Sequence, residues 1–412
     1  RSLVGSEMCI RDSTYAIREV AYRRGDSREL SRVFSEIITL QGGVGLVVLA
    51  AYVLYVVRWG EPYRVAFLLQ GLAIIGGMLD VSWFHIGREN FRRNALTIGC
   101  TRLLLLVGIV VFLRRFPDVS VYIGMTTGIL AVGYLFLWRG IFRVVRYRPP
   151  RFRDVVKHIG GCVTLFLIVL IGNFALSTFK TILGVRVSIE SVAAFDMAYR
   201  VTFFLLTFSV VIGTVLIPRI AHAVSCNDHA AVVRYLQKSF QIVTGITLPV
   251  SAGLHAVAPV FVRWFFGERF ETVIPLLQIL SVTIVLNAWS NVIATQYMVP
   301  AGKEKMYVRS LLFGNSAAVI LALPASIRAG ALGVCWARVV GELLVLIVHF
   351  LQVRSSLPVR SIAGDSWKYV VAAAPMYAVV RWVMHRSGWN GFGGLLVYAA
   401  VGVAVYGVFV FC

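Results

Sequence analysis

The sequence predicts an all-α protein that crosses a membrane about twelve times. Two observations support this prediction: the apolar composition and the repeated apolar runs. Of its 412 residues 58% are apolar and 14% are charged, and the mean hydropathy is +0.81. Soluble globular domains carry about 25% charged residues. Apolar runs of roughly 20 residues recur from Ile37 onward, and each suffices to cross a hydrocarbon layer about 30 Å thick. None shows the ten-residue alternation of a barrel strand, so helices are expected.

The expected spans follow one another along the whole chain. The apolar runs place them at residues 37–57, 64–84, 94–113, 119–138, 158–178, 192–217, 240–260, 273–298, 310–327, 331–352, 367–384 and 391–411. Residues 1–13, RSLVGSEMCIRDS, contain neither a span nor the apolar core of a signal peptide. We interpret them as a non-native, adapter-derived leader and leave them out of the fold prediction.

The lysines and arginines behind the net charge of +21 are distributed as the predicted topology requires. One alternate set of connections holds 24 of the 40 lysines and arginines, and the opposite set holds 11. Lysine and arginine in short loops stay on the cytoplasmic side, so the first set is assigned to the cytoplasm. The charge therefore needs no nucleic acid as a partner. Its densest run, from Arg139 to Lys157, resembles a linker lying on anionic cytoplasmic lipid.

Similar patterns in the two halves predict a parallel internal repeat. Gly87 and Arg88, after the second span, match Gly302 and Lys303, after the eighth, and a glutamate follows each pair. The second half has two additional leading helices, so we expect two more helices upstream and about fourteen in the intact protein. The predicted segments are the leader (1–13), four helices of an N-terminal lobe (14–140), a basic linker (141–157), a six-helix C-terminal lobe (158–353) and a final pair (354–412).

Several motifs resemble those of the Wzx-type polysaccharide flippases. The most specific is LDVSWFHIGRENF at 79–91, and the others are YAIREV at 15–20, FSEI at 34–37, ILG at 182–184, PRI at 218–220, PAGK at 300–303 and GALG at 330–333 with Glu342. These flippases belong to the superfamily that also contains multidrug exporters and the lipid II flippase. The resemblance runs from about residue 14 to the end, without the first helix pair of such proteins. Lys180 stands where the family often has an acidic residue.

The resemblance implies two pseudo-symmetric helical lobes around a central cavity in a bacterial inner membrane. It also implies that the substrate is an undecaprenyl-diphosphate-linked oligosaccharide, flipped by alternating access for surface polysaccharide or O-antigen synthesis. Such a protein would have a lipid-linked glycan and membrane lipids as partners, with a polysaccharide polymerase and chain-length regulators as further candidates. A sugar hydroxyl drawn unpaired into hydrocarbon costs roughly 4 to 8 kcal/mol, so a polar passage is required.

Charged residues inside the spans are the candidates for lining that passage. Arg102 lies about nine residues into its span, where a charge costs at least about 2.5 kcal/mol. It is either a cavity cation for the diphosphate or a structural arginine paired with an acid on a neighbouring helix. Arg338 and Glu342 stand four residues apart, as do Asp196 and Arg200. Each pair is either mutually neutralised or has one member facing the cavity, with Glu342 and Asp196 as coupling candidates.

Three further residues are candidates: Asp80 for a gate or for coupling, and Lys180 and Arg186 as weaker ones. Asp80 lies near the cytoplasmic end of its span, followed by Trp83 and Phe84. It is interpreted as an ordinary helix-end carboxylate or as a gate contact with a basic loop. Lys180 and Arg186 lie near the outer end of another helix, where snorkelling is the default and a phosphate contact the alternative.

The sequence offers no support for catalysis. The six cysteines form no CxxC, the histidines form no HExxH, and neither a P-loop nor a Ser-His-Asp order is present. No catalytic residue, metal site or cofactor is therefore predicted. Two other functions remain as alternatives: a drug or cation exporter of the same superfamily, which would need a more acidic cavity, and a membrane glycan polymerase or ligase. Such an enzyme usually carries a large outer loop, whereas the predicted outer loops are short.

Overall fold

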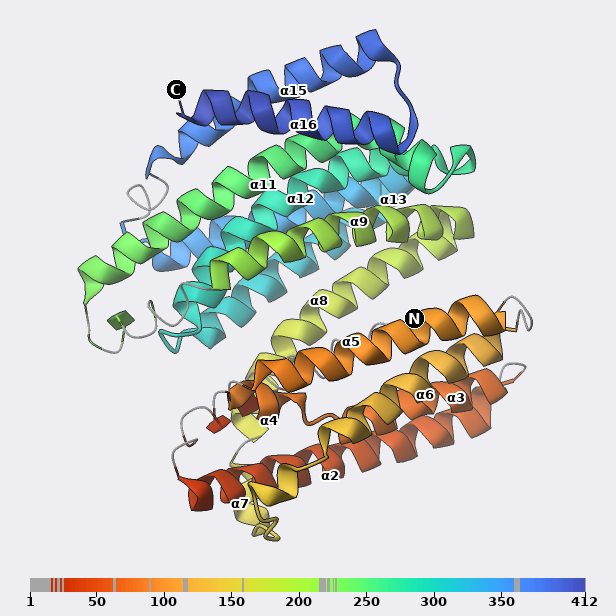
Figure 1. Ribbon diagram of the computed structural model, residues 1–412, viewed down its shortest axis with the longest axis vertical. Coiled ribbons are helices and arrows are strands. Elements are labelled where there is room, and N and C mark those ends of the chain that lie inside the picture. The colour runs from red at the N-terminus through yellow and green to blue at the C-terminus, as the bar shows by residue number, and fades with distance from the viewer. Residues whose placement is uncertain are drawn as a thin grey trace. The chain divides into compact units, whose positions relative to one another are not determined.

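The computed structural model is built from helices that form two compact units (Figure 1). Unit 1 extends to Val169 and unit 2 from Leu170 to Cys412. The structure describes residues 16–17, 19–20, 23, 26–61, 64–88, 90–113, 118–157, 159–214, 220, 223–224, 226, 228–358 and 364–411. The proposed leader, 1–13, lies outside these residues.

Unit 1 contains four long helical segments followed by the basic linker. They are α2 (Ser27–Trp59), α3 (Arg64–Leu79) with the short α4 (Ser82–Gly87), α5 (Phe91–Gly108) with a π-helical end (Ile109–Leu113), and α6 (Val119–Leu137). Asp26 caps α2, since its side chain accepts the N–H groups of Arg28 and Glu29. The linker contains the five-residue helix α7 (Phe152–Val156).

The predicted span 64–84 is interrupted, which corrects the sequence prediction of one continuous helix. α3 ends at Leu79 and α4 begins at Ser82. Such a break frees backbone carbonyls, and because Asp80 and Val81 are buried, other groups of the protein must satisfy them. The Gln41 amide nitrogen of α2 donates to the Gly77 and Asp80 carbonyls at 2.6 and 2.9 Å, and the Trp138 indole donates to the Leu79 carbonyl at 2.7 Å.

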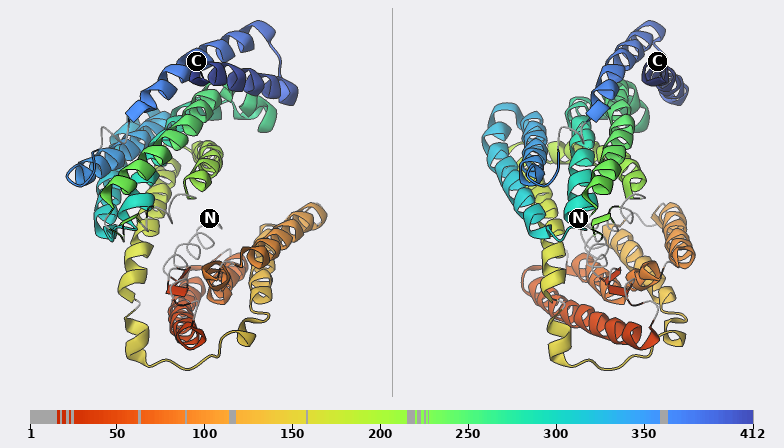
Figure 2. Two further views of the ribbon diagram at one scale, coloured as in Figure 1. Left: turned by 60° about the vertical axis from the view of Figure 1, so that its left-hand side comes forward. Right: turned by 90° about the vertical axis from the view of Figure 1, so that its left-hand side faces the viewer.

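Unit 2 contains the remaining helices. They are most of α8 (Ile159–Arg186), then α9 (Ile189–Thr214), α11 (His229–Phe265), α12 (Val273–Ile293) with a π-helical end η4 (Ala294–Met298), α13 (Glu304–Val353), α15 (Trp367–Ser387) and α16 (Gly391–Phe411). α12 packs against α9, α11 and α13. Both views in Figure 2 show α15 and α16, in dark blue, as a helical hairpin beside α11.

The observed helices confirm the predicted fold class and correct several boundaries. Nine helical segments among the described residues are long and apolar enough to cross a membrane. One of them, α13, covers the predicted spans 310–327 and 331–352. These two arms meet without a loop at Gly330 (φ 55°, ψ −131°), where the chain reverses and forms a helical hairpin. α2 begins ten residues before the predicted span, since its first turns are polar and a prediction based on apolar residues leaves them out. The boundary between the two compact units falls inside α8.

The two units share internal features that agree with the predicted repeat. In unit 1 the rings of Phe34 and Trp83 lie 5.7 Å apart, and in unit 2 those of Phe240 and Trp289 lie 5.5 Å apart. The spacing along the chain is the same, and in each unit the phenylalanine lies on a long capped helix and the tryptophan on or just after the following one. That following helix is irregular at its end in both units, with the break after α3 and the π-helix η4 after α12.

The two arms of α13 approach closely at glycines. A Cβ atom on Gly341 would collide with the Cβ of Ala318 and lie 3.1 Å from the Gly314 carbonyl oxygen. A Cβ atom on Gly314 would in turn lie 2.8 Å from the Gly341 carbonyl oxygen. Small residues of this kind let helix backbones pack tightly in membranes. This contact fixes the arm that bears Arg338 and Glu342 against the preceding arm.

Gly341→Ala is expected to lower the thermal unfolding temperature of the purified protein in detergent. The added methyl group has no space, and overpacking of this kind costs about 1 to 3 kcal/mol. Gly253→Ala is the matched control, because Gly253 also lies inside a helix of unit 2 but has no neighbouring atom within 4 Å of the position that a Cβ would take. The control should be neutral or slightly stabilising. An equal unfolding temperature for the two variants would contradict the close contact.

Candidate functional site

Arg102 lies in the middle of a membrane-spanning helix with an exposed side chain. It is the eleventh residue of the 21-residue apolar segment Arg92–Phe112, and four leucines, residues 103–106, follow it directly. The described residues provide neither an ion pair nor a hydrogen bond to its guanidinium group. The structure therefore gives no support to the structural interpretation, in which a neighbouring acid neutralises Arg102. Its assignment as a cavity cation stays a prediction.

Asp196 joins two helices through two cations. Its carboxylate lies 2.5 Å from the Lys180 Nζ of α8 and accepts a hydrogen bond of 2.6 Å from the Arg200 Nε of α9. The Asp196–Arg200 pair is the one expected from their spacing. The Lys180 contact differs from the expected snorkelling at the helix end, because a carboxylate of the neighbouring helix is within its reach. The cluster keeps one excess positive charge, and half of the Arg200 side chain is exposed.

Arg338 and Glu342 form a buried ion pair on the second arm of α13. Their side chains are 13% and 9% exposed, and the Arg338 Nη2 contacts the Glu342 Oε1. The Arg338 Nη1 also donates to the Asn315 Oδ1 on the first arm, at 3.3 Å. The Asn315 amide nitrogen donates to the Leu311 carbonyl. The expected pairing is therefore present, and Asn315 extends it across the helical hairpin.

The structure places the remaining two candidates at helix ends. Asp80 is buried, and its carboxylate accepts the Ser82 N–H at 2.8 Å, at the break between α3 and α4. That contact agrees with a structural role, and no ion pair to a basic loop occurs among the described residues. Arg186 is exposed at the last position of α8. Arg102 and Asp80 belong to unit 1, and the other candidates belong to unit 2.

Sequence reasoning missed two polar groups that these contacts reveal. Asn315 is 7% exposed within an otherwise apolar run, and that contrast alone would have marked it as a polar residue at membrane depth. Glu36 is 1% exposed and contacts both Arg32 and Lys157. Its spacing of four residues from Arg32 is a recognisable signal, but its partner Lys157 is 121 residues away. No group of three or more metal-binding side chains occurs among the described residues.

Comparisons with known proteins agree on the type of fold. Residues 128–275 match the sequence model of a family described as "Polysaccharide biosynthesis protein". No curated protein sequence matches the chain. Among solved structures, the lipid II flippase MurJ in an inward closed conformation matches with a TM-score of 0.68 and 14% identity, covering 99% of this chain and 91% of MurJ.

Two other solved structures with this fold are transporters of the MOP superfamily. An outward-facing multidrug resistance MATE family transporter of the MOP superfamily gives a TM-score of 0.65 at 17% identity, with 87% of this chain and 86% of that chain covered. The second is a MOP superfamily transporter from Pyrococcus furiosus, whose reversed binding-pocket polarity suggests a different function. It matches with a TM-score of 0.64 at 18% identity, covering 88% of this chain and 86% of that chain.

These findings define the class of protein. The chain is a multi-pass, helical membrane protein whose fold matches those of MurJ and of transporters of the MOP superfamily. The resemblance found in its motifs is thereby confirmed at the level of fold.

Proposed function

We propose that this protein flips an undecaprenyl-diphosphate-linked oligosaccharide repeat unit across the bacterial cytoplasmic membrane by alternating access. The observation that carries the proposal is the match of residues 128–275 to polysaccharide biosynthesis proteins, on a fold that MurJ shares. The product would serve surface polysaccharide or O-antigen synthesis. A polysaccharide polymerase and chain-length regulators would then act on the same substrate.

The charges of the candidate residues support an anionic substrate. The candidates comprise five basic residues, Arg102, Lys180, Arg186, Arg200 and Arg338, against three acidic ones, Asp80, Asp196 and Glu342. A diphosphate linker is anionic, and a guanidinium group can bind its oxygens with two parallel hydrogen bonds. Within the proposal, Arg102 and Arg200 bind the diphosphate because their side chains are exposed.

The ion pairs supply the groups that can change partner during transport. Lys180 and Arg200 compete for the same carboxylate of Asp196, so an entering phosphate can take one cation while the other remains paired. Glu342 is the coupling candidate, since protonation would release Arg338 to its second acceptor, Asn315. Asp80 is a gate candidate at the break between α3 and α4, with Arg186 a weaker phosphate contact at the outer end of α8.

A drug or cation exporter is the nearest alternative, because MATE transporters have the same fold. It would favour a net negative set of membrane-depth residues, whereas the set here is net positive. A glycan polymerase or ligase is less compatible with the fold matches, which are to transporters and flippases.

A reconstitution experiment separates these functions. The purified chain is placed in phospholipid vesicles that contain a polyprenyl-diphosphate-linked oligosaccharide with a fluorescent sugar in both leaflets. A membrane-impermeant reductant bleaches only the outer half of the label unless the protein flips the remainder. We expect nearly complete bleaching, with no change in glycan length and no accumulation of a cationic dye. Bleaching that stops at half, dye accumulation or glycan elongation would each overturn the proposal.

A further inference from the structure

The basic linker is fixed to unit 1 along one side. Ile141, Val145 and Val155 are all at least nine-tenths buried, and the first two belong to the apolar cluster around Phe34 and Phe84. The backbone N–H groups of residues 146 and 148 donate to the hydroxyls of residues 31 and 35, one turn apart on α2, at 3.2 and 3.0 Å. The linker is therefore an ordered surface element of this unit.

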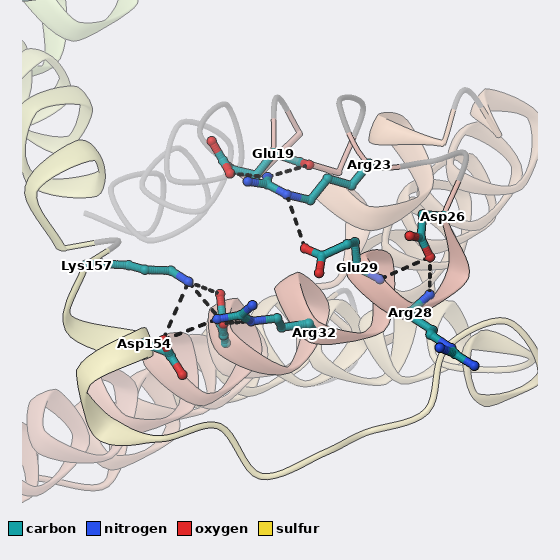
Figure 3. A network of polar contacts seen from close by, with 9 residues as sticks. Glu19, Arg23, Asp26, Arg28, Glu29, Arg32, Asp154 and Lys157 are labelled. Carbon is teal, nitrogen blue, oxygen red and sulfur yellow. Dashed lines mark hydrogen bonds and ion pairs between the residues drawn. The ribbon is translucent and has the colours of Figure 1, made fainter.

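Ion pairs attach the short helix α7 to the same face of α2 (Figure 3). The buried Glu36 carboxylate accepts the Arg32 Nε at 2.9 Å and contacts the Lys157 Nζ at 3.0 Å. Asp154 lies 3.4 Å from the Arg32 Nη2 and 4.0 Å from the Lys157 Nζ. Two cations and two carboxylates thus balance each other on this attached side. This cluster therefore carries no net charge.

The linker also carries unbalanced positive charge and exposed aromatic rings. Five arginines are exposed, and no ion pair to any of them occurs in the described part of the chain: Arg143, Arg146, Arg148, Arg151 and Arg153. Three aromatic residues are exposed among them, with Phe152 at 84%, Phe142 at 60% and Tyr147 at 49%. A surface made for a cytosolic acidic partner would need the charges but not a phenylalanine this exposed.

The contacts with α2 also set the depth of this surface. The Tyr147 hydroxyl lies 3.1 Å from the Thr39 hydroxyl, and the apolar run of α2 begins at Ile37. Tyr147 therefore reaches the level at which α2 enters hydrocarbon. Arg148, held at Ser35, lies one turn before that level, where headgroups are found. Aromatic rings and arginines prefer this interfacial layer.

We propose that the exposed side of residues 142–156 is a docking surface for anionic phospholipid headgroups of the cytoplasmic leaflet. The five guanidinium groups pair with headgroup phosphates, and Phe142, Tyr147 and Phe152 insert at the acyl boundary. Because the linker is already ordered on α2, little further conformational entropy is lost when lipid binds. The inference stands apart from the proposed function, since it concerns the bilayer and not the transported molecule.

Hydrogen–deuterium exchange of the full chain in nanodiscs tests this proposal. The protein is compared in neutral phosphatidylcholine and in a mixture with phosphatidylglycerol. We expect the amides of 151–157 to exchange about ten-fold more slowly in the anionic discs, since each arginine near an anionic surface contributes measurably to binding. The difference should shrink in about 0.5 M salt, where charges are screened over a few ångströms.

Two sets of variants provide the controls. The triple variant Arg148→Gln, Arg151→Gln, Arg153→Gln should lose the difference between the two lipids, because it removes three of the five exposed positive charges of the linker. The matched triple variant Lys305→Gln, Arg309→Gln, Arg354→Gln removes the same amount of charge from exposed positions of unit 2. This variant should retain the difference in exchange between the two lipids. Equal exchange in both lipids, or protection that survives the linker triple variant, would overturn the proposal. So would protection that appears only when an acidic protein is added.

Discussion

Arg102→Ala is expected to reduce flipping of a diphosphate-linked oligosaccharide by about 10- to 100-fold, while the protein remains folded. A hydrogen bond to a charged group contributes about 1.5 to 3 kcal/mol, and alanine removes the whole guanidinium group. Arg102 has an exposed side chain, and none of the described residues forms an ion pair with it, so the change leaves none of them without a partner. The bleaching assay in vesicles measures the rate.

The stability of the same variant separates the two interpretations of Arg102. A charge in the middle of a span costs at least about 2.5 kcal/mol, so removing an unpaired arginine should leave the unfolding temperature unchanged or raise it. A structural arginine would instead leave its acid partner buried alone, and the temperature would fall. Leu103→Ala, at the next exposed position, is the control for loss of side-chain volume. Normal flipping by Arg102→Ala would remove this residue from the mechanism.

Breaking the Arg338–Glu342 pair is expected to have the largest effect on stability. Removing one member of a buried ion pair costs about 3 to 5 kcal/mol because the other charge stays buried without a partner. Arg338→Met and Glu342→Leu should each lower the unfolding temperature strongly. The double variant should recover most of the loss, because two apolar side chains of similar volume leave no buried charge. Additive losses in the double variant would show that the pair is not the source of the effect.

Glu342→Gln tests coupling separately from stability. The amide oxygen still accepts a hydrogen bond from Arg338, so we expect the protein to insert and fold, but glutamine cannot take up or release a proton. Any dependence of flipping on a pH gradient should therefore disappear in this variant. Unchanged dependence would exclude Glu342 as the coupling group.

The spans could be predicted from sequence because each one must by itself be long and apolar enough to cross the bilayer. Runs of about 20 apolar residues and the side preference of basic loops are properties of single segments. The break at Asp80 could not be predicted in this way. Its carbonyls are satisfied by Gln41 and Trp138, which lie 39 and 59 residues away from their acceptors Asp80 and Leu79, and no local pattern reports such contacts. The turn at Gly330 is a similar case, since a glycine between two spans usually indicates a loop.

The candidate site was predictable only where partners are neighbours on one helix. The spacing of four residues predicted the pairs of Asp196 with Arg200 and of Glu342 with Arg338, and both are present. The contact of Lys180 with Asp196 joins two helices, so no local spacing could indicate it. Lys180 therefore suggested a snorkelling residue, although packing places a carboxylate 2.5 Å away.

The reversal of α13 at Gly330 affects how the protein can be studied. Because the helix turns back within a single residue of positive φ, almost no polypeptide projects there for a protease, an antibody or an inserted epitope. Tags for topology mapping should be accepted far better at the connection between α15 and α16. That connection contains Gly388 in a left-handed conformation and the exposed Trp389, so added residues can extend into solvent without disturbing a helix.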